Sequence, residues 1–264
     1  MKHLKKIIFT AVLAAALSTS AFAASGFEFI LNVPLGMNIG MGQSIDHIAQ
    51  YNGEKVYRAD YSPDNFLGFT TGVEAQVGYM FQVVNNFGIS LLGEVGYRFD
   101  TITANYSYSY GTNNLYKEGD KLRENPITSS AHSFKIGLFP KFNIKAFSIG
   151  IGGGIIIPVS GSIVYKGNDG INHQVGDNYK AQFDKSELPV GLYFKLSLDY
   201  SIFFTETSAL NLGLYATFTA VGGLKIPDNS SLNDYPKADI YYYRPFTGID
   251  VGAQIGYRFG PKAF

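Results

Sequence analysis

The stretch Thr247-Gly-Ile-Asp-Val-Gly-Ala-Gln-Ile-Gly-Tyr-Arg-Phe259 alternates without interruption between two kinds of side chain. After Thr247, its odd-numbered positions are apolar or aromatic, and its even-numbered positions are glycine, glutamine or charged residues. A period of two residues over this length predicts a β-strand with one apolar and one polar face. Charges on the second face would be costly in the core of a soluble protein. We therefore expect the apolar face to meet lipid and the polar face to line the inside of a barrel.

Seven further segments show the same alternation, which brings the expected number of strands to eight. Near 66–81, for example, Val73, Ala75 and Val77 alternate with Glu74, Gln76 and Gly78. The expected strands are 27–41, 66–81, 87–103, 133–142, 147–165, 188–204, 210–224 and 247–259.

The connections between these segments alternate in length. Three are short, at about 82–86, 143–146 and 205–209, and four are long and polar, at about 42–65, 104–132, 166–187 and 225–245. Long loops at one end and tight turns at the other are typical of outer-membrane barrels, and loops of this length are unusual in a compact soluble domain. The fold class predicted is therefore all-β, an eight-stranded antiparallel up-and-down transmembrane β-barrel.

The first residues have the three parts of a secretory signal peptide. A basic start, 1–6, precedes an apolar run, 7–17, and an Ala-x-Ala cleavage site at Ala21-Phe22-Ala23. We expect a signal peptide over 1–23 and a single barrel domain over 24–264. After Ala24 no run of about 18 apolar residues follows, so no transmembrane helix is expected there.

The composition excludes several classes of function. Removing Lys2, Lys5 and Lys6 leaves 18 basic against 21 acidic residues, which is no basic field for nucleic acid. The chain has no cysteine, which excludes disulfides, thiol nucleophiles and cysteine-type zinc sites. The loop carboxylates have no EF-hand spacing, and Gly150–Gly154 lacks both the G-x-G-x-x-G spacing and a following helix. No cofactor or metal is expected.

The polar face also indicates which side of the sheet is inside. A lipocalin-like soluble barrel would instead bury the apolar face around a ligand. Here the polar face is rich in glycine and serine, as the narrow interior of eight strands requires, and it carries charges of both signs. Six acids and five bases predict a paired network in the lumen, formed by Glu28, Glu74, Glu94, Arg98, Asp100, Lys135, Lys141, Lys195, Asp199, Asp250 and Arg258.

Aromatic residues gather where the strands meet the short turns or the end of the last strand. Such a position predicts a girdle at the periplasmic interface of the membrane. Its members are Tyr79, Phe81, Phe87, Phe142, Phe147, Phe204, Tyr257 and Phe259.

With these features the chain resembles the small eight-stranded outer-membrane barrels of diderm bacteria, the OmpA-, OmpX- and opacity-like group, without a periplasmic domain. The resemblance is architectural and covers the whole mature chain. The last strand is also similar to the signal that such proteins present to the barrel-assembly machinery, with Asp250, Gly252, Ile255, Tyr257 and Phe259 at the matching positions. The chain continues beyond Phe259 to Phe264, so either aromatic residue can have the terminal role.

Some barrels of this size modify lipid A, so catalysis is an alternative. The mature chain has only His47, His132 and His173, and neither His47 nor His173 has a serine and a carboxylate at a recognisable spacing. Deacylase barrels use a His-x-Ser arrangement, whereas His132 and Ser133 are adjacent and so point to opposite faces. We expect no enzymatic activity.

Two functions remain open at this stage. The lumen charges could line a small porin-like pore, but the balance of signs and the narrow ring favour a closed barrel. The tyrosine-rich stretches 105–111 and 241–243 are either recognition surfaces or simple strand extensions. We expect an integral protein of the bacterial outer membrane with turns and both termini periplasmic. Its expected partners are outer-membrane lipid and lipopolysaccharide, the assembly machinery, and a host or matrix ligand bound by the extracellular loops in adhesion.

Overall fold

The computed structural model describes residues 25–41, 45–51, 54–111, 123–166, 178–184, 189–222, 224–225, 242–243 and 247–263. The expected signal peptide, 1–23, lies outside these ranges. In the part of the chain that is described, no helix has the length and apolar character needed to cross a membrane.

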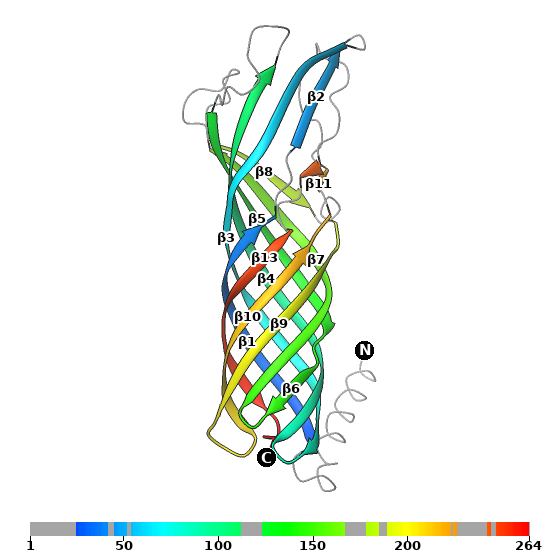
Figure 1. The fold of residues 1–264 in the computed structure, drawn as a ribbon, viewed down its shortest axis with the longest axis vertical. Helices are drawn as coiled ribbons and strands as arrows, with labels where there is room; N and C mark the ends of the chain where they lie inside the picture. The colour runs from blue at the N-terminus through cyan, green and yellow to red at the C-terminus, as the bar shows by residue number, and fades with distance from the viewer. Residues whose placement is uncertain are drawn as a thin grey trace, which may run out of the picture.

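Eight wall strands form a closed ring (Figure 1). In ring order they are β1 (Gly26–Gly40), β3 (Glu54–Val84), β4 (Phe87–Gly111), β5 (Arg123–Leu138) continued by β6 (Lys141–Ile144), β7 (Phe147–Lys166), β9 (Gly191–Phe203), β10 (Ser208–Ala220) and β13 (Gly248–Phe259). Each pairs antiparallel with its neighbours along the chain, and β13 closes the ring on β1 from Phe29↔Phe259 to Gly40↔Gly248. The predicted all-β, eight-stranded antiparallel up-and-down barrel is confirmed.

The strands are strongly tilted, as Figure 1 shows. A path that moves from each residue to its partner on the next strand, once around the ring, starts at Phe29 of β1 and ends at Ile39, ten residues further along the same strand. The path runs through Val77, Gly93, Leu138, Gly153, Phe194, Phe218 and Ile249. A stagger of this size in eight strands requires a tilt of about 35–45° and leaves an interior that side chains can fill.

The wall strand formed by β5 and β6 differs from the predicted strand 133–142. It begins earlier, at Arg123, and the ladder is interrupted at Phe139 and Pro140. Proline has no N–H to donate, which breaks the ladder. The wall stays connected because the Phe139 N–H donates to Leu92 O (2.7 Å) and Pro140 O accepts from the Ile151 N–H (3.0 Å).

The short connections lie where the sequence predicts them. The turns are at 85–86, 145–146 and 204–207. Asn86 (φ 67°) and Lys145 (φ 55°) have left-handed backbones, which asparagine tolerates better than most residues. These turns and the C-terminal end of the chain lie together at one end of the barrel (Figure 1).

Three of the expected long loops contain strand instead. The region 42–65 includes β2 (Ile45–Tyr51) and the first part of β3, β4 continues to Gly111, and β8 (Asn178–Asp184) pairs with the end of β7. The fourth region holds only the short pair β11 (Leu224–Lys225) and β12 (Tyr242–Tyr243) among its described residues. The tyrosine-rich stretch 105–111 is therefore an extension of β4, paired with β3 and β5. These extensions lack the apolar alternation of the lower wall, which is why the sequence pattern missed them.

The outer and inner faces of the wall differ as the alternation predicts. On β9 the outward side chains of Leu192, Leu196 and Leu198 are 64%, 44% and 59% exposed, whereas Lys195 and Asp199 between them are 0% and 2% exposed. Apolar side chains are thus outside and charges inside.

The apolar outer band has a defined height. On β4 the outward positions from Phe87 to Phe99 are apolar, aromatic or glycine. At about 3.4 Å per residue and a tilt of about 40°, this run covers about 30 Å along the barrel axis, the thickness of a bilayer core. Above it hydroxyl side chains pair on the outside, with Thr103 and Thr128 at 3.0 Å and Ser130 and Ser162 at 2.8 Å.

Two tyrosines inside the ring lie across paired glycines. Tyr215 pairs with Gly252, which pairs with Gly36, and a Cβ added at Gly36 would lie 2.4 Å from the Tyr215 hydroxyl. Tyr193 reaches Gly137 across Gly154 in the same way, with the same 2.4 Å separation. Glycine at these positions is needed so that the rings can fill the interior.

We predict that Gly36→Val destabilises the barrel by about 1–3 kcal/mol, because its side chain would overlap Tyr215 and the backbone of Val251. Gly93→Val is the matched control, because Gly93 faces outward and an added Cβ meets only Val77 O, at 3.7 Å. Urea unfolding in lipid vesicles measures both variants. Equal stability of the two would contradict the packing described.

Candidate functional site: the charged interior of the barrel

All eleven charged residues predicted for the lumen lie inside the barrel. Each is at most 6% exposed, and each takes part in at least one ion pair. They come from every wall strand except β7 and β10, because each strand presents alternate residues to the interior. Four groups follow one another along the barrel axis.

The central group joins two acids and two lysines. Glu74 forms ion pairs with both Lys135 and Lys195. Glu94 lies 3.6 Å from Lys135 Nζ and 4.0 Å from Lys195 Nζ. The formal charges of the four side chains cancel.

Uncharged side chains complete the central group. The Gln76 amide and the Tyr193 hydroxyl each donate to Glu94, at 2.8 Å. Lys135 Nζ lies 4.7 Å from the centre of the Tyr193 ring, and Lys195 Nζ lies 5.3 Å from that of Tyr215. Aromatic faces thus stabilise both ammonium groups where carboxylates do not reach them.

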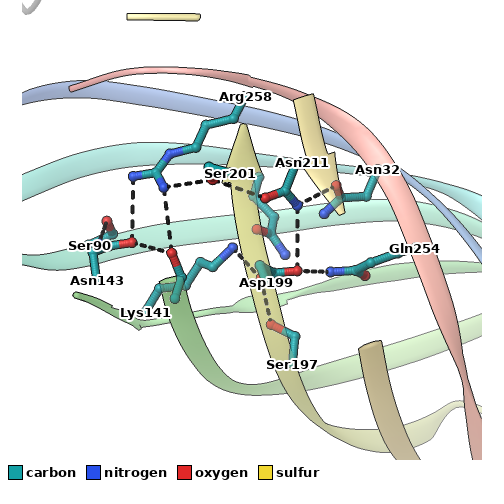
Figure 2. Close-up of polar contacts among 12 residues, drawn as sticks. Asn32, Ser90, Lys141, Asn143, Ser197, Asp199, Ser201, Asn211, Gln254 and Arg258 are labelled. Carbon is teal, nitrogen blue, oxygen red and sulfur yellow. Dashed lines mark hydrogen bonds and ion pairs between the residues drawn. The ribbon is translucent and has the colours of Figure 1, made fainter. Parts of the chain in front are cut away.

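A second group lies nearer the turns, around Asp199 (Figure 2). Lys141 Nζ is 2.7 Å from Asp199, and Gln254 and Ser197 donate to the same carboxylate at 2.6 and 2.9 Å. Lys195 also donates to Gln254 (3.2 Å), which connects this group to the central one. One carboxylate is thus held by residues of β6, β9 and β13.

The third group closes the turn end of the interior around Arg258. Its guanidinium lies 2.8 Å from Glu28 and donates to the Ser201 hydroxyl (3.1 Å). The Ser90 hydroxyl donates a hydrogen bond to Glu28. It also accepts one from the Asn143 amide, at 2.8 Å. Figure 2 shows Arg258, Ser201, Ser90 and Asn143 of this group pointing toward one another.

The fourth group lies toward the long-loop end. Arg98 Nε is 2.7 Å from Asp100, and Arg98 Nη1 is 3.0 Å from Asp250. Thr219 accepts a further bond from Arg98, at 3.4 Å. One guanidinium here forms ion pairs with two carboxylates, so this group has a formal charge of −1.

The sequence pattern missed several interior residues that complete the packing. Tyr193, Tyr215 and Phe139 are large rings on the polar face, and their positions in the alternation are the signal that could have found them. Phe139 is fully buried beside Gly150 and Gly152, where an added Cβ would lie 2.3 and 2.1 Å from its ring. The glycine run of β7 thus makes room for an aromatic ring.

The residues of the predicted assembly signal divide between the two faces of β13. Asp250 is buried and bound to Arg98, whereas Ile255, Tyr257 and Phe259 are 53%, 42% and 41% exposed on the outer face. Gly252 lies beneath the Tyr215 ring, in register with Gly36. Recognition of these residues by the assembly machinery stays a prediction.

The aromatic residues of the expected girdle lie on the outer wall at the turn end. Phe204 and Tyr257 have ring centres 6.3 Å apart, and Tyr79 and Phe81 are at 4.8 Å. Tyr200, which the sequence pattern did not include, packs on Phe147 at 4.7 Å.

His132 lies on the outer wall at the upper edge of the apolar band. Its Nδ1 shares a hydrogen bond with the Tyr97 hydroxyl, and its ring centre is 4.8 Å from that of Phe99. Ser133 next to it is 2% exposed and faces the interior. Within the described ranges, no group of three or more histidine, aspartate or glutamate side chains is placed to hold a metal ion. His173 lies outside those ranges, and of His47 only the backbone, in β2, is described.

The chain is an inside-out barrel, with an apolar outer wall and a polar interior, which is the architecture of transmembrane β-barrels. No protein-family model and no curated protein matches it. Three proteins among the solved structures are similar in fold. The outer membrane protease OmpT from Escherichia coli is 13% identical (88% of this chain, 96% of that chain, TM-score 0.36), and the outer membrane protein OprG from Pseudomonas aeruginosa is 14% identical (88% and 94%, TM-score 0.32). The attachment invasion locus protein Ail of Yersinia pestis is 11% identical (89% and 99%, TM-score 0.31). Because the identities are low and the TM-scores lie below 0.5, the fold is established by the strand pairing of this chain itself.

We predict that Glu74→Gln destabilises the barrel by about 3–5 kcal/mol, because Lys135 and Lys195 would lose the carboxylate that they share. Glu206→Gln, in an exposed turn, should change stability by less than about 0.5 kcal/mol. Heat-dependent gel migration and urea unfolding measure both. A double variant, Glu74→Gln with Lys135→Met, should recover part of the loss, and no recovery would argue against pairing as the cause.

Proposed function

We propose that this protein is a non-enzymatic integral protein of the bacterial outer membrane that displays extended strands and loops at the cell surface. The observation that carries the proposal is the contrast between the two faces of the wall. About 30 Å of apolar surface surrounds an interior in which eleven charged side chains are buried and paired. Such a surface is stable in lipid and would aggregate in water.

The difference between the two ends of the barrel supports the proposed orientation. Tight turns suit the periplasmic side, and the strands that extend above the apolar band suit the extracellular side. In this orientation β2, β8 and the upper parts of β3, β4, β5 and β7 stand outside the cell. Outer-membrane lipid and lipopolysaccharide surround the wall.

We predict that Leu196→Arg prevents or strongly weakens insertion, because it places a charge in the middle of the apolar wall. The expected cost is about 2–4 kcal/mol for arginine near the bilayer midplane. Glu206→Arg, in an exposed turn, is the control and should insert normally. Outer-membrane fractionation and heat-dependent migration measure both. A Leu196→Arg chain that inserts as well as Glu206→Arg would refute a lipid-facing wall.

The proposed role at the surface is structural or adhesive. Tyrosine provides a large amphipathic contact area at low entropic cost, and β4 carries three tyrosines between 105 and 111 in its extension above the membrane. The partner would be a host or matrix component bound by this part of the chain.

We predict that replacing Tyr106, Tyr108 and Tyr110 with serine leaves the barrel folded and lowers binding to matrix-coated surfaces or host cells. The three residues lie in the extension of β4, which pairs with β3 and β5 through the backbone. Heat-dependent migration tests the fold, and adhesion of bacteria expressing each chain tests binding. Glu206→Gln, in an exposed turn at the opposite end, is the control and should adhere normally. Unchanged adhesion of the tyrosine variant would restrict the role to a structural one.

Two other functions make different predictions. A small conducting pore would give steady single-channel openings in planar bilayers, which the paired interior argues against, since eight strands leave no room for a wide channel. A lipid A-modifying enzyme would change lipid A acylation on expression, seen by mass spectrometry. His132 does not favour this activity, because its described partners are Tyr97 and Phe99. Either result would replace the proposal.

A further inference from the structure

The chain turns inward directly after its last strand. Phe259 faces outward and is 41% exposed, whereas Gly260 is buried and Ala263 is only 1% exposed. We call residues 260–263 the C-terminal strap. In Figure 1 the chain end lies at the turn end of the barrel.

Gly260 makes this change of direction possible. Its φ of +154° is rarely adopted by residues with a side chain. An added Cβ would also lie 3.1 Å from Cα and Cγ of Glu28. Both facts require glycine at the point where the strap begins.

Several contacts hold the strap against the barrel mouth. The Gly260 N–H donates to Thr207 O (2.8 Å), and Arg258 donates to Pro261 O (3.4 Å). Lys262 Nζ lies 5.7 Å from the centre of the Phe203 ring, which also has the Arg258 guanidinium at 5.6 Å. The strap thus spans from β13 to the turn after β9 and to β9 itself.

The strap lies beside the third charged group of the interior. Arg258 Nη1 donates to Ser201, and Arg258 Nη2 lies within reach of both Glu28 and the strap carbonyl of Pro261. Lys262 adds one positive charge at the mouth. A charge pair at the end of a barrel would meet water unless something covers it, and the strap is positioned to do so.

We propose that the C-terminal strap closes the turn-side mouth of the barrel and keeps the periplasmic solvent away from the Arg258–Glu28 pair. This goes beyond the proposed surface role, because it assigns a separate function to the residues that follow the last strand. Closure depends on local contacts of few residues, so the strap can open without unfolding of the wall.

Cysteine reactivity tests the proposal cleanly, because the chain contains no cysteine. Ser201→Cys places a nearly isosteric thiol in the Arg258 group, at a position 2% exposed. In the refolded full chain it should react slowly with a small water-soluble methanethiosulfonate. In the chain ending at Phe259 it should react at least about tenfold faster, because local opening is no longer required.

Thr217→Cys is the matched control. Thr217 is 1% exposed and pairs with Lys195 of the central group and with Asp250 of the fourth group, away from the strap, so removal of the strap should leave its reactivity unchanged. Increased reactivity at both positions would indicate general loosening and overturn the proposal. Equal reactivity of Ser201→Cys in the full and shortened chains would also overturn it.

A second variant keeps the chain at full length. Gly260→Val should displace the strap, because the new side chain would overlap Glu28 and adopt an unfavourable φ. We expect Ser201→Cys to gain reactivity in this background to about the same extent as in the shortened chain. Heat-dependent migration shows that each chain has folded before labelling. A Gly260→Val chain that is folded and still protected would overturn the proposal.

Discussion

Closure of the ring is the constraint on which the rest of the structure depends. In lipid every backbone N–H and C=O must find a partner within the protein, so a sheet can cross only if it has no free edge. The pairing of β13 with β1 over twelve positions removes the last edge. The stagger that permits this closure also sets the tilt of the strands and the width of the interior. At Pro140 the ladder loses one donor, and bonds on both sides of that position keep the wall continuous.

A narrow closed interior determines which side chains can occupy it. Large rings fit only where neighbouring strands have glycine, as Tyr215 does over Gly252 and Gly36 and Phe139 does beside Gly150 and Gly152. Charges fit only where opposite charges or hydrogen-bond donors surround them, because an isolated buried charge costs several kcal/mol. The arrangement along the axis satisfies both requirements at once. The central group is neutral, its two lysines lie over the rings of Tyr193 and Tyr215, and Gln254 connects it to the group around Asp199.

Much of this could be predicted from the sequence, because two simple physical rules govern the wall. Alternation with period two showed the eight strands, the inward charges and the outward apolar residues. It could not show which acid pairs with which base, since Glu74, Lys135 and Lys195 come from three strands and meet only through the register of the ring. It also failed above the membrane, where β2, β8 and the ends of β3 and β4 are held by strand pairing and lack one continuous apolar face. The strap was missed because its four residues have no periodicity and their position depends on Gly260 and Thr207.

The two ends of the barrel are built on different principles, and this difference bears on function. At the turn end the connections are short, Lys145 of one turn bonds to Asn86 of another (3.1 Å), and the strap lies beneath the Arg258 group. At the opposite end four wall strands continue beyond the apolar band while β1, β9, β10 and β13 have ended or have yet to begin. The extension is therefore one-sided, an open sheet in the order β2–β3–β4–β5–β7–β8 above a closed ring. The stability of the ring comes from contacts within the membrane. The sequence of the extension above it can therefore change without unfolding the ring. This separation of a rigid wall from an exposed sheet favours a surface role for the protein over transport through its interior.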